Sequence, residues 1–462
     1  MRLLLGLGVL GLLAGEALSQ ASITFITSGR AEAVSPDGNW VVGRNGNGEA
    51  FRWDPVTGAQ SLFGNAAVGV SADGQTVFGD GGTTPAQPAI WNGGSWTDLG
   101  GLLGSSGCPD LGTAYAFSDD GTTGTGLIWD DCNAHAFRWT AGAAIPYTVL
   151  PQNGPISSRG NAISGNGSII GGWDEAANGT RRAVIWLPNG VQRFVLANTP
   201  GNQIGAGEVW GLNTNGTIAV GQSNVGAFRW TAGGGAVQLG DPLGTNSPAA
   251  AMGVSDDGTM IVGTAGTFIS GLSAFIWTEA QGMMLLDDYV TNVLGLTLPP
   301  NVTLQGATDI TPDGRTIVGY GGTGPFFTDA FVLRLPFPCG WSTYGDTEPA
   351  PNVLDLSGAG SVNLGGVFQA VTTGLTSSVC VTATSFAPAD FPAFGGTGLL
   401  DLFQFYDYTA NLAVGGTATR TVPLPANPTL AGAQLYFQSF ALDGSQPEGW
   451  GLSNGLLLTL CP

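Results

Sequence analysis

The chain has 462 residues, with 33 acidic and 13 basic side chains and a formal net charge of −20 at pH 7. A surface of this charge repels phosphate groups, so nucleic acid and anionic lipid are excluded as expected partners. The sequence contains no lysine, which excludes Schiff-base chemistry and a lysine general base. An acidic, lysine-free composition fits either a salty environment or a biased genome.

The first 19 residues have the pattern of a secretory signal peptide. Arg2 supplies a positive start, residues 3–13 form an apolar run, and Ala17-Leu18-Ser19 provides small residues for cleavage. The run is too short for a stable transmembrane anchor, and no later segment is apolar for long enough to span a bilayer. We therefore expect an exported, soluble protein, secreted or at the cell surface, without membrane insertion.

Seven short turn sequences follow, and each ends in Asp-Gly or Asn-Gly. These dipeptides are strong hairpin signals because both positions tolerate a positive φ at low cost. The turns are Ser35-Pro36-Asp37-Gly38, Ser71-Ala72-Asp73-Gly74, Ser118-Asp119-Asp120-Gly121, Ser164-Gly165-Asn166-Gly167, Asn213-Thr214-Asn215-Gly216, Ser255-Asp256-Asp257-Gly258 and Thr311-Pro312-Asp313-Gly314. Their glycines are 36 to 56 residues apart. We number the repeat units one to seven by these turns.

An apolar strand follows each turn and carries the second half of the repeat. Its fullest copy is His135-Ala136-Phe137-Arg138-Trp139. The other copies are Ala50-Phe51-Arg52-Trp53, Ala89-Ile90-Trp91, Ala183-Val184-Ile185-Trp186, Ala227-Phe228-Arg229-Trp230, Ala274-Phe275-Ile276-Trp277 and Ala330-Phe331-Val332-Leu333. Because side chains alternate along a strand, Phe51 and Trp53 share one face. We expect such pairs to pack between neighbouring units.

About four strands per unit, repeated every 45 residues or so, are typical of propeller blades. A lone four-stranded sheet leaves both of its apolar faces exposed to solvent, whereas seven sheets arranged around an axis cover these faces. We therefore predict an all-β fold, with a seven-bladed β-propeller over residues 20–335. Unit seven lacks its last strand, and we expect Ile23-Thr24-Phe25-Ile26 to supply it and close the ring. Any ligand is expected in the central funnel, rimmed by the longest connections, residues 101–113 and 287–305.

The alternation of Ser-x-Asp-Gly turns with the motif at residues 135–139 resembles the HAF-type family of extracellular repeats. The turns alone are also similar to the Ser-Pro-Asp-Gly units of TolB-like propellers. The resemblance covers roughly residues 30–335, and it implies a propeller without implying a reaction. Units two, four, six and seven depart from the motif because they lack its arginine, and unit seven also lacks its tryptophan.

The repeats end at a proline-broken linker, residues 336–339, and the rest of the chain lacks the Asp-Gly periodicity. Strand-like runs separated by Gly and Pro predict a C-terminal β-sandwich over residues 336–462. The segment Pro428-Thr429-Leu430-Ala431-Gly432, followed by Tyr436-Phe437-Gln438, resembles tail domains of uncharacterised secreted bacterial proteins.

Five cysteines in an exported chain predict disulfide bonds. Cys108 and Cys132 flank the core of unit three, so we expect them to pair. Three cysteines remain in the tail, which leaves one without a partner. We predict a Cys339–Cys461 bond, because it ties the two ends of the tail domain together. No CxxC pair is present, so a zinc site is not expected.

His135 is the only histidine, so a Ser-His-Asp or Cys-His site has to use it. Its equivalents in other units are Glu49, Gly226 and Ser273, which favours an exposed or locally hydrogen-bonded structural role. No phosphate-binding loop and no HExxH motif is present. We predict no catalytic and no cofactor-binding residue.

The recurrent aspartates are expected to shape the turns. Asp119, Asp120, Asp256 and Asp257 form adjacent pairs and are the candidates for Ca²⁺ coordination. No Ca²⁺-loop spacing is present, so a solvated surface is the alternative interpretation of these pairs. Apart from Ca²⁺, no metal or cofactor is expected.

Arg52, Arg138 and Arg229 recur in units one, three and five and are the candidate ligand-binding residues, for an anionic sugar. The alternative is that each arginine bridges neighbouring units, because its planar guanidinium suits buried polar pairing.

We expect a secreted binding or structural module that recognises a polysaccharide or another surface protein through the funnel, rather than an enzyme. One alternative is an extracellular carbohydrate-active hydrolase or lyase that uses Asp and Glu side chains in the funnel. Such an enzyme needs two carboxyl groups about 5–10 Å apart. The other alternative is a purely structural matrix component, which should have no pocket.

Overall fold

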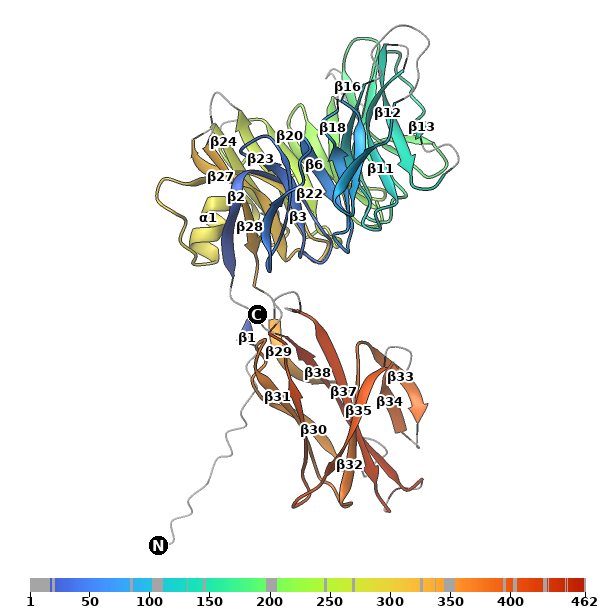
Figure 1. Cartoon of the computed structure of the whole chain (residues 1–462), viewed down its shortest axis with the longest axis vertical. Helices are drawn as coiled ribbons and strands as arrows, with labels where there is room; N and C mark the ends of the chain where they lie inside the picture. The colour runs from blue at the N-terminus through green and yellow to red at the C-terminus, as the bar shows by residue number, and fades with distance from the viewer. Residues whose placement is uncertain are drawn as a thin grey trace. The chain divides into compact units, whose positions relative to one another are not determined.

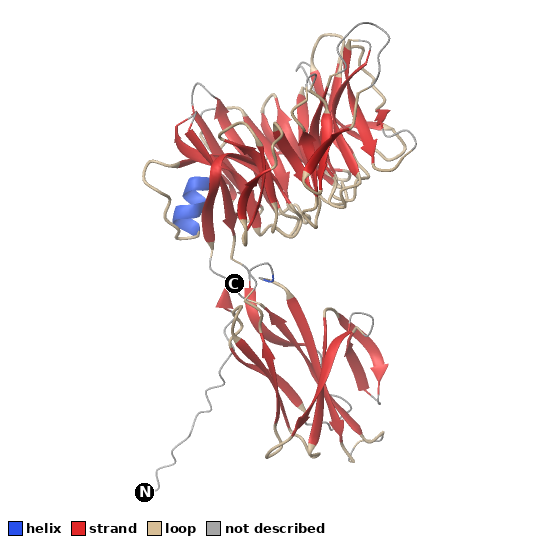
Figure 2. Ribbon diagram, viewed as in Figure 1, coloured by secondary structure: helices blue, strands red, loops and turns tan. Residues whose placement is uncertain are grey.

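The fold was analysed in a computed structural model of the chain. It describes residues 17–18, 21–83, 86–101, 111–130, 132–143, 147–196, 206–244, 247–267, 271–324, 327–336, 338–344, 354–393, 396–401, 405–426, 430, 432–444, 446 and 448–460. The chain divides into two compact units, Ala21–Leu335 and a second that combines Met1–Gln20 with Pro336–Pro462. Strands dominate both (Figure 2), and the protein is all-β. No helix within the described ranges is long and apolar enough to cross a membrane.

The repeat region is built from antiparallel sheets whose strands follow one another in chain order. Units two to six are separate four-stranded sheets, whereas units one and seven are joined in one seven-stranded sheet. The first strands are β6 (Ala66–Val70), β10 (Gly112–Phe117), β14 (Ser158–Ile163), β18 (Gly207–Leu212), β22 (Ala249–Val254) and β26 (Thr303–Ile310). The second strands are β3 (Val41–Asn45), β7 (Thr76–Asp80), β11 (Thr123–Asp130), β15 (Ile170–Glu175), β19 (Ile218–Ser223), β23 (Met260–Thr267) and β27 (Thr316–Gly324).

The outer half of each sheet carries the apolar motif and then a short edge strand. The third strands are β4 (Ala50–Asp54), β8 (Pro88–Asn92), β12 (Asn133–Thr140), β16 (Arg181–Trp186), β20 (Gly226–Thr231), β24 (Gly271–Thr278) and β28 (Phe327–Arg334). The fourth strands are β5 (Gly58–Ser61), β9 (Ser95–Asp98), β13 (Tyr147–Val149), β17 (Gln192–Phe194), β21 (Gly235–Gln238) and β25 (Gly282–Leu285). Two short helical segments, α1 (Leu286–Asp288) and η1 (Tyr289–Val293), connect units six and seven.

The long strand β2 (Ser22–Val34) belongs to two units. Its first half, residues 22–28, pairs antiparallel with β28, and its second half, residues 29–34, pairs with β3. Figure 1 shows β2 beside β28, which comes from the far end of the repeat region. Strand β2 is therefore both the fourth strand of unit seven and the first strand of unit one, so the last unit is hydrogen-bonded to the first.

Each sheet also contacts the next sheet along the chain. The contacts run between β3 and β6, β7 and β10, β11 and β14, β15 and β18, β19 and β22, and β23 and β26. In every case the first strand of one unit meets the second strand of the preceding unit. The seven units thus form a continuous series whose two ends are paired through β2.

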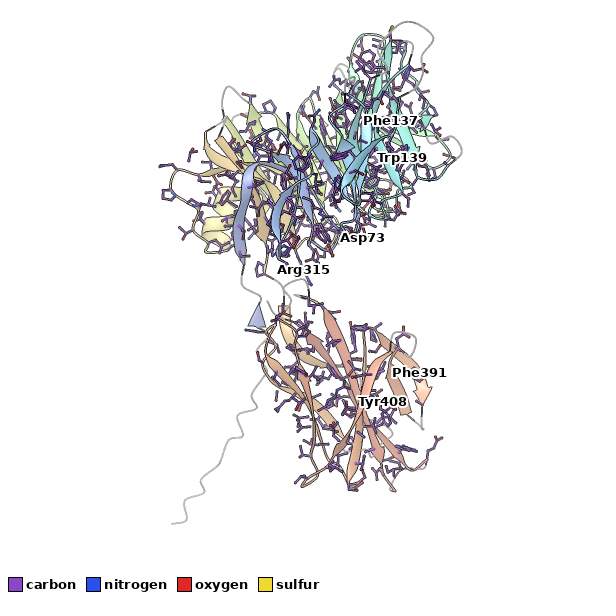
Figure 3. The ribbon with its side chains drawn as sticks, in the orientation of Figure 1. Asp73, Phe137, Trp139, Arg315, Phe391 and Tyr408 are labelled. Atoms are coloured by element: carbon purple, nitrogen blue, oxygen red, sulfur yellow. The ribbon has the colours of Figure 1, made fainter. Side chains whose placement is uncertain are left out.

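The turns have the geometry that their sequences predict. All seven turn glycines have a positive φ between 69° and 73°. In unit two, Asp73 accepts hydrogen bonds from Ser71 Oγ at 2.6 Å and from the Gln75 N–H at 3.0 Å. Asp73 lies at the turn end of the sheets (Figure 3). The interpretation of these aspartates as turn residues is confirmed.

The aromatic pairs pack between neighbouring units, as the strand pattern predicts. Phe137 and Trp139 of β12 (Figure 3) lie in one buried cluster with Phe78 of unit two. The Phe78 and Trp139 ring centroids are 6.3 Å apart. Burial of such a pair stabilises the interface by roughly 3–6 kcal/mol before conformational entropy is counted.

The C-terminal unit contains two sheets and a hairpin. The six-stranded sheet has the order β1 (Ala17–Leu18), β29 (Pro338–Tyr344), β38 (Trp450–Thr459), β37 (Gln434–Leu442), β32 (Val379–Ser385) and β35 (Phe405–Leu412). The other strands are β30 (Asp355–Gly360), β31 (Val367–Thr373) and β36 (Ala418–Pro423) in a three-stranded sheet, with β33 (Pro388–Ala393) and β34 (Gly396–Leu400) in the hairpin. Phe368 of β31 and Phe437 of β37 are fully buried in one cluster, so the two sheets share a core.

The cysteines are only partly within the described residues. Cys132 is disulfide-bonded and has a positive φ of 68°. Cys108 and Cys461 lie outside the described residues, so the Cys108–Cys132 and Cys339–Cys461 bonds remain predictions. Cys380 is a free, buried cysteine in β32.

Candidate functional site

One β-bulge recurs at the same place in every repeat unit. The register between the first and second strands shifts at the residue three positions before the first turn residue, and unit seven has a second shift at Gln305. A bulge redirects a side chain that regular alternation would place elsewhere. The bulged residues, which we call the bulge ring, are Glu32, Val68, Tyr115, Asn161, Trp210, Met252 and Thr308.

All seven residues of the bulge ring line one cavity of about 440 Å³. The wall continues along each first strand toward the turns. The turn residues that complete it are Pro36, Asp119, Gly165, Asn213, Thr214, Asp256 and Pro312. Every repeat unit therefore contributes to a single central cavity.

The local sequence explains why the first strands approach so closely. In most units an alanine or glycine stands on each side of the bulged residue, as in Ala67-Val68-Gly69. A Cβ atom added to Gly69 would lie 2.5 Å from the Cβ of Phe117 in the next unit. Small residues thus permit the close packing, and the bulged residue between them differs in every unit. The bulge ring was not predicted from the sequence. The available signal was a residue that differs from unit to unit and stands between two small residues in most units.

Hydrogen bonds donated by backbone N–H groups link the turns at one end of the cavity. The turn of unit two donates to that of unit three, and the series continues through unit seven. The donors and acceptors are Ala72 N–H to Asp119 O at 2.7 Å, Asp119 N–H to Gly165 O at 2.9 Å, Asn166 N–H to Thr214 O at 2.9 Å, Thr214 N–H to Asp256 Oδ1 at 2.8 Å and Asp256 N–H to Pro312 O at 2.8 Å. Units seven and one have proline at this turn position and are joined by side chains instead. The N–H of Val34 donates to Asp309 Oδ2 at 3.0 Å, and Thr308 Oγ1 donates to Ala31 O at 2.9 Å.

The cavity is acidic. The carboxylates among its lining residues are Glu32, Asp119, Asp256 and Asp309, and none of the described lining residues is basic. Burial raises the pKa of Glu32 to about 7, although the charges of Arg30 and Arg44 oppose the shift. Burial, and then the charge of Asp256, raise the pKa of Asp119 to about 6.

Asp309 occupies the junction between units seven and one. Burial raises its pKa to about 7, while hydrogen bonds from the N–H groups of Val34 and Ile310 oppose the rise. The Asp256 carboxylate accepts its hydrogen bond from the Thr214 N–H. Two of the cavity carboxyl groups, those of Asp256 and Asp309, therefore accept hydrogen bonds from backbone N–H groups.

Arg159 holds several bulge-ring residues in place. Its guanidinium donates to Tyr115 Oη at 3.1 Å, to Asn161 Oδ1 at 2.6 Å and to Glu208 Oε2 at 3.0 Å. The Arg159 Cζ atom lies 4.6 Å from the Tyr115 ring centroid and 5.3 Å from that of Trp210. Trp210 Nε1 is buried and has no hydrogen-bond partner among the described residues.

The arginines that the sequence analysis proposed as ligand-binding residues lie away from the cavity. Arg52 donates to the carbonyl oxygen of Gly74, and Arg138 donates to those of Gly167 and Ser168. Each of these two arginines thus binds the turn of the next unit.

The corresponding contacts in later units follow the same pattern. A Cβ atom added to Gly258 in the turn of unit six would lie 2.9 Å from Arg229 Nη2, which places Arg229 against that turn. Arg334 completes the series from unit seven, because its Nη2 donates to Gly38 O in unit one at 2.9 Å. The geometry of these arginines fits the bridging interpretation.

The remaining candidates separate into different roles. Asp120 and Asp257 accept hydrogen bonds from the turn serines, whereas Asp119 and Asp256 line the cavity. Within the described ranges, no three His, Cys, Asp or Glu side chains are grouped to hold a metal ion. His135 shares a hydrogen bond with Gln152 at 2.8 Å, outside the cavity wall.

The long connection before unit seven does not line the cavity, contrary to expectation. Leu286 and Val290 are fully buried and pack with Leu304 and Phe331, so the apolar side chains of this connection fill the space between sheets. In the other connection, residues 102–110 lie outside the described residues.

Comparison with known proteins finds no matching family model and no matching curated protein. Among solved structures, a protein assigned as TolB from Agrobacterium tumefaciens is similar, with 13% identity and a TM-score of 0.35, over 70% of this chain and 100% of its own. TolB from Acinetobacter baumannii has 12% identity and a TM-score of 0.35, over 67% of this chain and 66% of its own. Similarity of this size supports no statement about function.

Proposed function

We propose that the chain is an exported binding protein whose ligand occupies the central cavity. In this proposal residues 21–335 form a seven-bladed β-propeller of the HAF type, and the two C-terminal sheets form a β-sandwich. The ligand is part of a polysaccharide or of another surface protein. Export is supported by the signal-like residues 1–19.

One observation carries the proposal: the seven repeat units place seven chemically different side chains around one cavity. The turns recur in all seven units, and the aromatic pairs and the flanking small residues recur in most of them, as a stable frame requires. The bulge ring instead contains acidic, aliphatic, aromatic, amide, thioether and hydroxyl groups. A constant frame with one variable position per unit suits recognition, and a volume of about 440 Å³ lies within the usual range for small-ligand sites.

The test is a glycan array and a pull-down with surface extracts, using the mature chain and two variants. Trp210→Ala and Met252→Ala remove bulge-ring side chains, and Val225→Ala changes an exposed side chain as the control. Binding that is lost in both cavity variants and kept in the control supports the proposal. Binding that persists in both cavity variants places the ligand elsewhere and contradicts it.

A second candidate function is hydrolysis of a polysaccharide, favoured by the carboxyl groups in the cavity. Glu32 and Asp309, with pKa values near 7, have the protonation state that a general acid needs, and Asp256 is a candidate base. Release of reducing ends from polysaccharides by the parent, and its loss in Asp309→Asn, supports this function. No release from any substrate that binds in the cavity contradicts it.

A further inference from the structure

The charge of the cavity selects among ligands, and this inference rests on the proposed binding function. Four carboxyl groups line the wall, and no arginine, lysine or histidine is among the described residues that do so. The whole chain, these groups included, carries a formal charge of −20, which repels anions and attracts cations. An anionic sugar therefore does not suit this site.

Two of the carboxyl groups lack the donors that buried carboxylates normally have. No described residue donates a hydrogen bond to Glu32 or Asp119, whereas Asp309 has two backbone donors and Asp256 has one. Both side chains are half-buried and line the cavity, so their carboxylates are open to it. A cationic group in the cavity supplies the missing partner.

The aromatic wall indicates what else the ligand carries. Trp210 lines the cavity, and its buried Nε1 donor has no acceptor among the described residues. The Nε1 atom is enclosed by the fold and is not open to a ligand, but the rings of Tyr115 and Trp210 line the cavity and suit a sugar ring. The ligand thus combines a cationic group with a sugar ring.

We propose that the central cavity binds an amino sugar with a protonated amine. The ammonium group lies at the turn end, in the field of Asp119, Asp256 and Asp309, and the sugar ring contacts the bulge ring at Trp210. The raised pKa values of Asp119 and Asp309 fit this position, since each is raised in part by a neighbouring carboxylate whose charge an ammonium group offsets.

Isothermal titration calorimetry of the mature chain at pH 7 tests the proposal with two matched probes. The β-1,4-linked glucosamine disaccharide carries the amines, and cellobiose has the same linkage with hydroxyl groups in their place. We expect the glucosamine disaccharide to bind at least tenfold more tightly. Asp119→Asn should weaken its binding at least tenfold, whereas Asp98→Asn, which makes the same change at an exposed site on β9, should not. Glu32→Gln provides a second cavity variant if Asp119→Asn fails to fold.

The outcomes separate this inference from the proposed function. Equal or tighter binding of cellobiose, weakened by Trp210→Phe, overturns the amino-sugar assignment and leaves the cavity as the binding site. Binding of the glucosamine disaccharide that is equally strong in Asp119→Asn and Glu32→Gln also overturns it, because the carboxylates then play no part. No binding of either disaccharide overturns the inference, and the array and pull-down then decide separately whether the cavity binds any ligand.

Discussion

Replacement of Gly258 by alanine is expected to destabilise the repeat region through two separable effects. Gly258 has a φ of 69°, and a non-glycine residue in this region costs about 1–2 kcal/mol. Its added Cβ would also lie 2.6 Å from Ile218 Cδ1 and 2.9 Å from Arg229 Nη2, both in unit five. Forcing these side chains aside costs about 1–3 kcal/mol more.

Gly235 provides the matched control. It also has a φ of 69°, but nothing lies within 4 Å of an added Cβ. We therefore expect Gly235→Ala to lose about 1–2 kcal/mol and Gly258→Ala to lose about 2–5 kcal/mol. Chemical denaturation and differential scanning calorimetry of the mature chain measure both values. Equal losses would refute the close packing of this turn on unit five, and no loss in either variant would refute the positive φ.

Three further predictions concern the junctions between units. Asp309 has a pKa raised from 3.8 to about 7, so the folded state holds its proton more tightly than the unfolded state does. The stability that Asp309 contributes is therefore complete below about pH 4 and is lost as pH rises toward 7. Asp309→Asn should remove at most about 4 kcal/mol of this pH dependence in denaturation curves recorded from pH 4 to 8, and unchanged curves would contradict the assignment. Arg334→Met leaves Gly38 O without its donor and should lower the free energy of unfolding by about 1.5–3 kcal/mol. The exposed Arg193→Met is the control and should lower it by less than about 1 kcal/mol. Equal losses would count against the hydrogen bond between units seven and one. Phe137→Ala empties a fully buried site and should lower the free energy of unfolding by about 3–5 kcal/mol. The exposed Val237→Ala is the control and should lower it by about 0.5 kcal/mol. Similar midpoints of thermal unfolding for the two variants would be inconsistent with the packing between units.

The repeated features of the fold could be predicted from the sequence because they depend on local chemistry. Asp-Gly turns require a positive φ at positions such as Gly38, and alternation along a strand places Phe137 and Trp139 on one face. These rules need no knowledge of which strand pairs with which. They therefore predicted the turns and the aromatic packing, although they do not by themselves place the units around an axis.

The cavity wall could not be predicted in the same way. A β-bulge is a property of the register between two strands, and regular alternation places Trp210 and Glu32 on the wrong face. A search for recurring residues also passes over a position that differs in every unit. The sequence pattern indicates Ca²⁺ coordination or a solvated surface for Asp119 and Asp256, because only the hydrogen bonds between successive turns bring them to the cavity wall.

A cross-link between the two ends of the repeat region tests the closed arrangement of the seven units most directly. Ser28 and Asp329 are opposed residues of β2 and β28, and both are exposed. Opposed Cα atoms in an antiparallel pair are about 4.5–5.5 Å apart, which is within the range of a disulfide bond. Mass spectrometry of non-reduced peptides from Ser28→Cys/Asp329→Cys should show a bond between these two positions. Free thiols at both positions in the folded protein would mean that the first and last units do not meet.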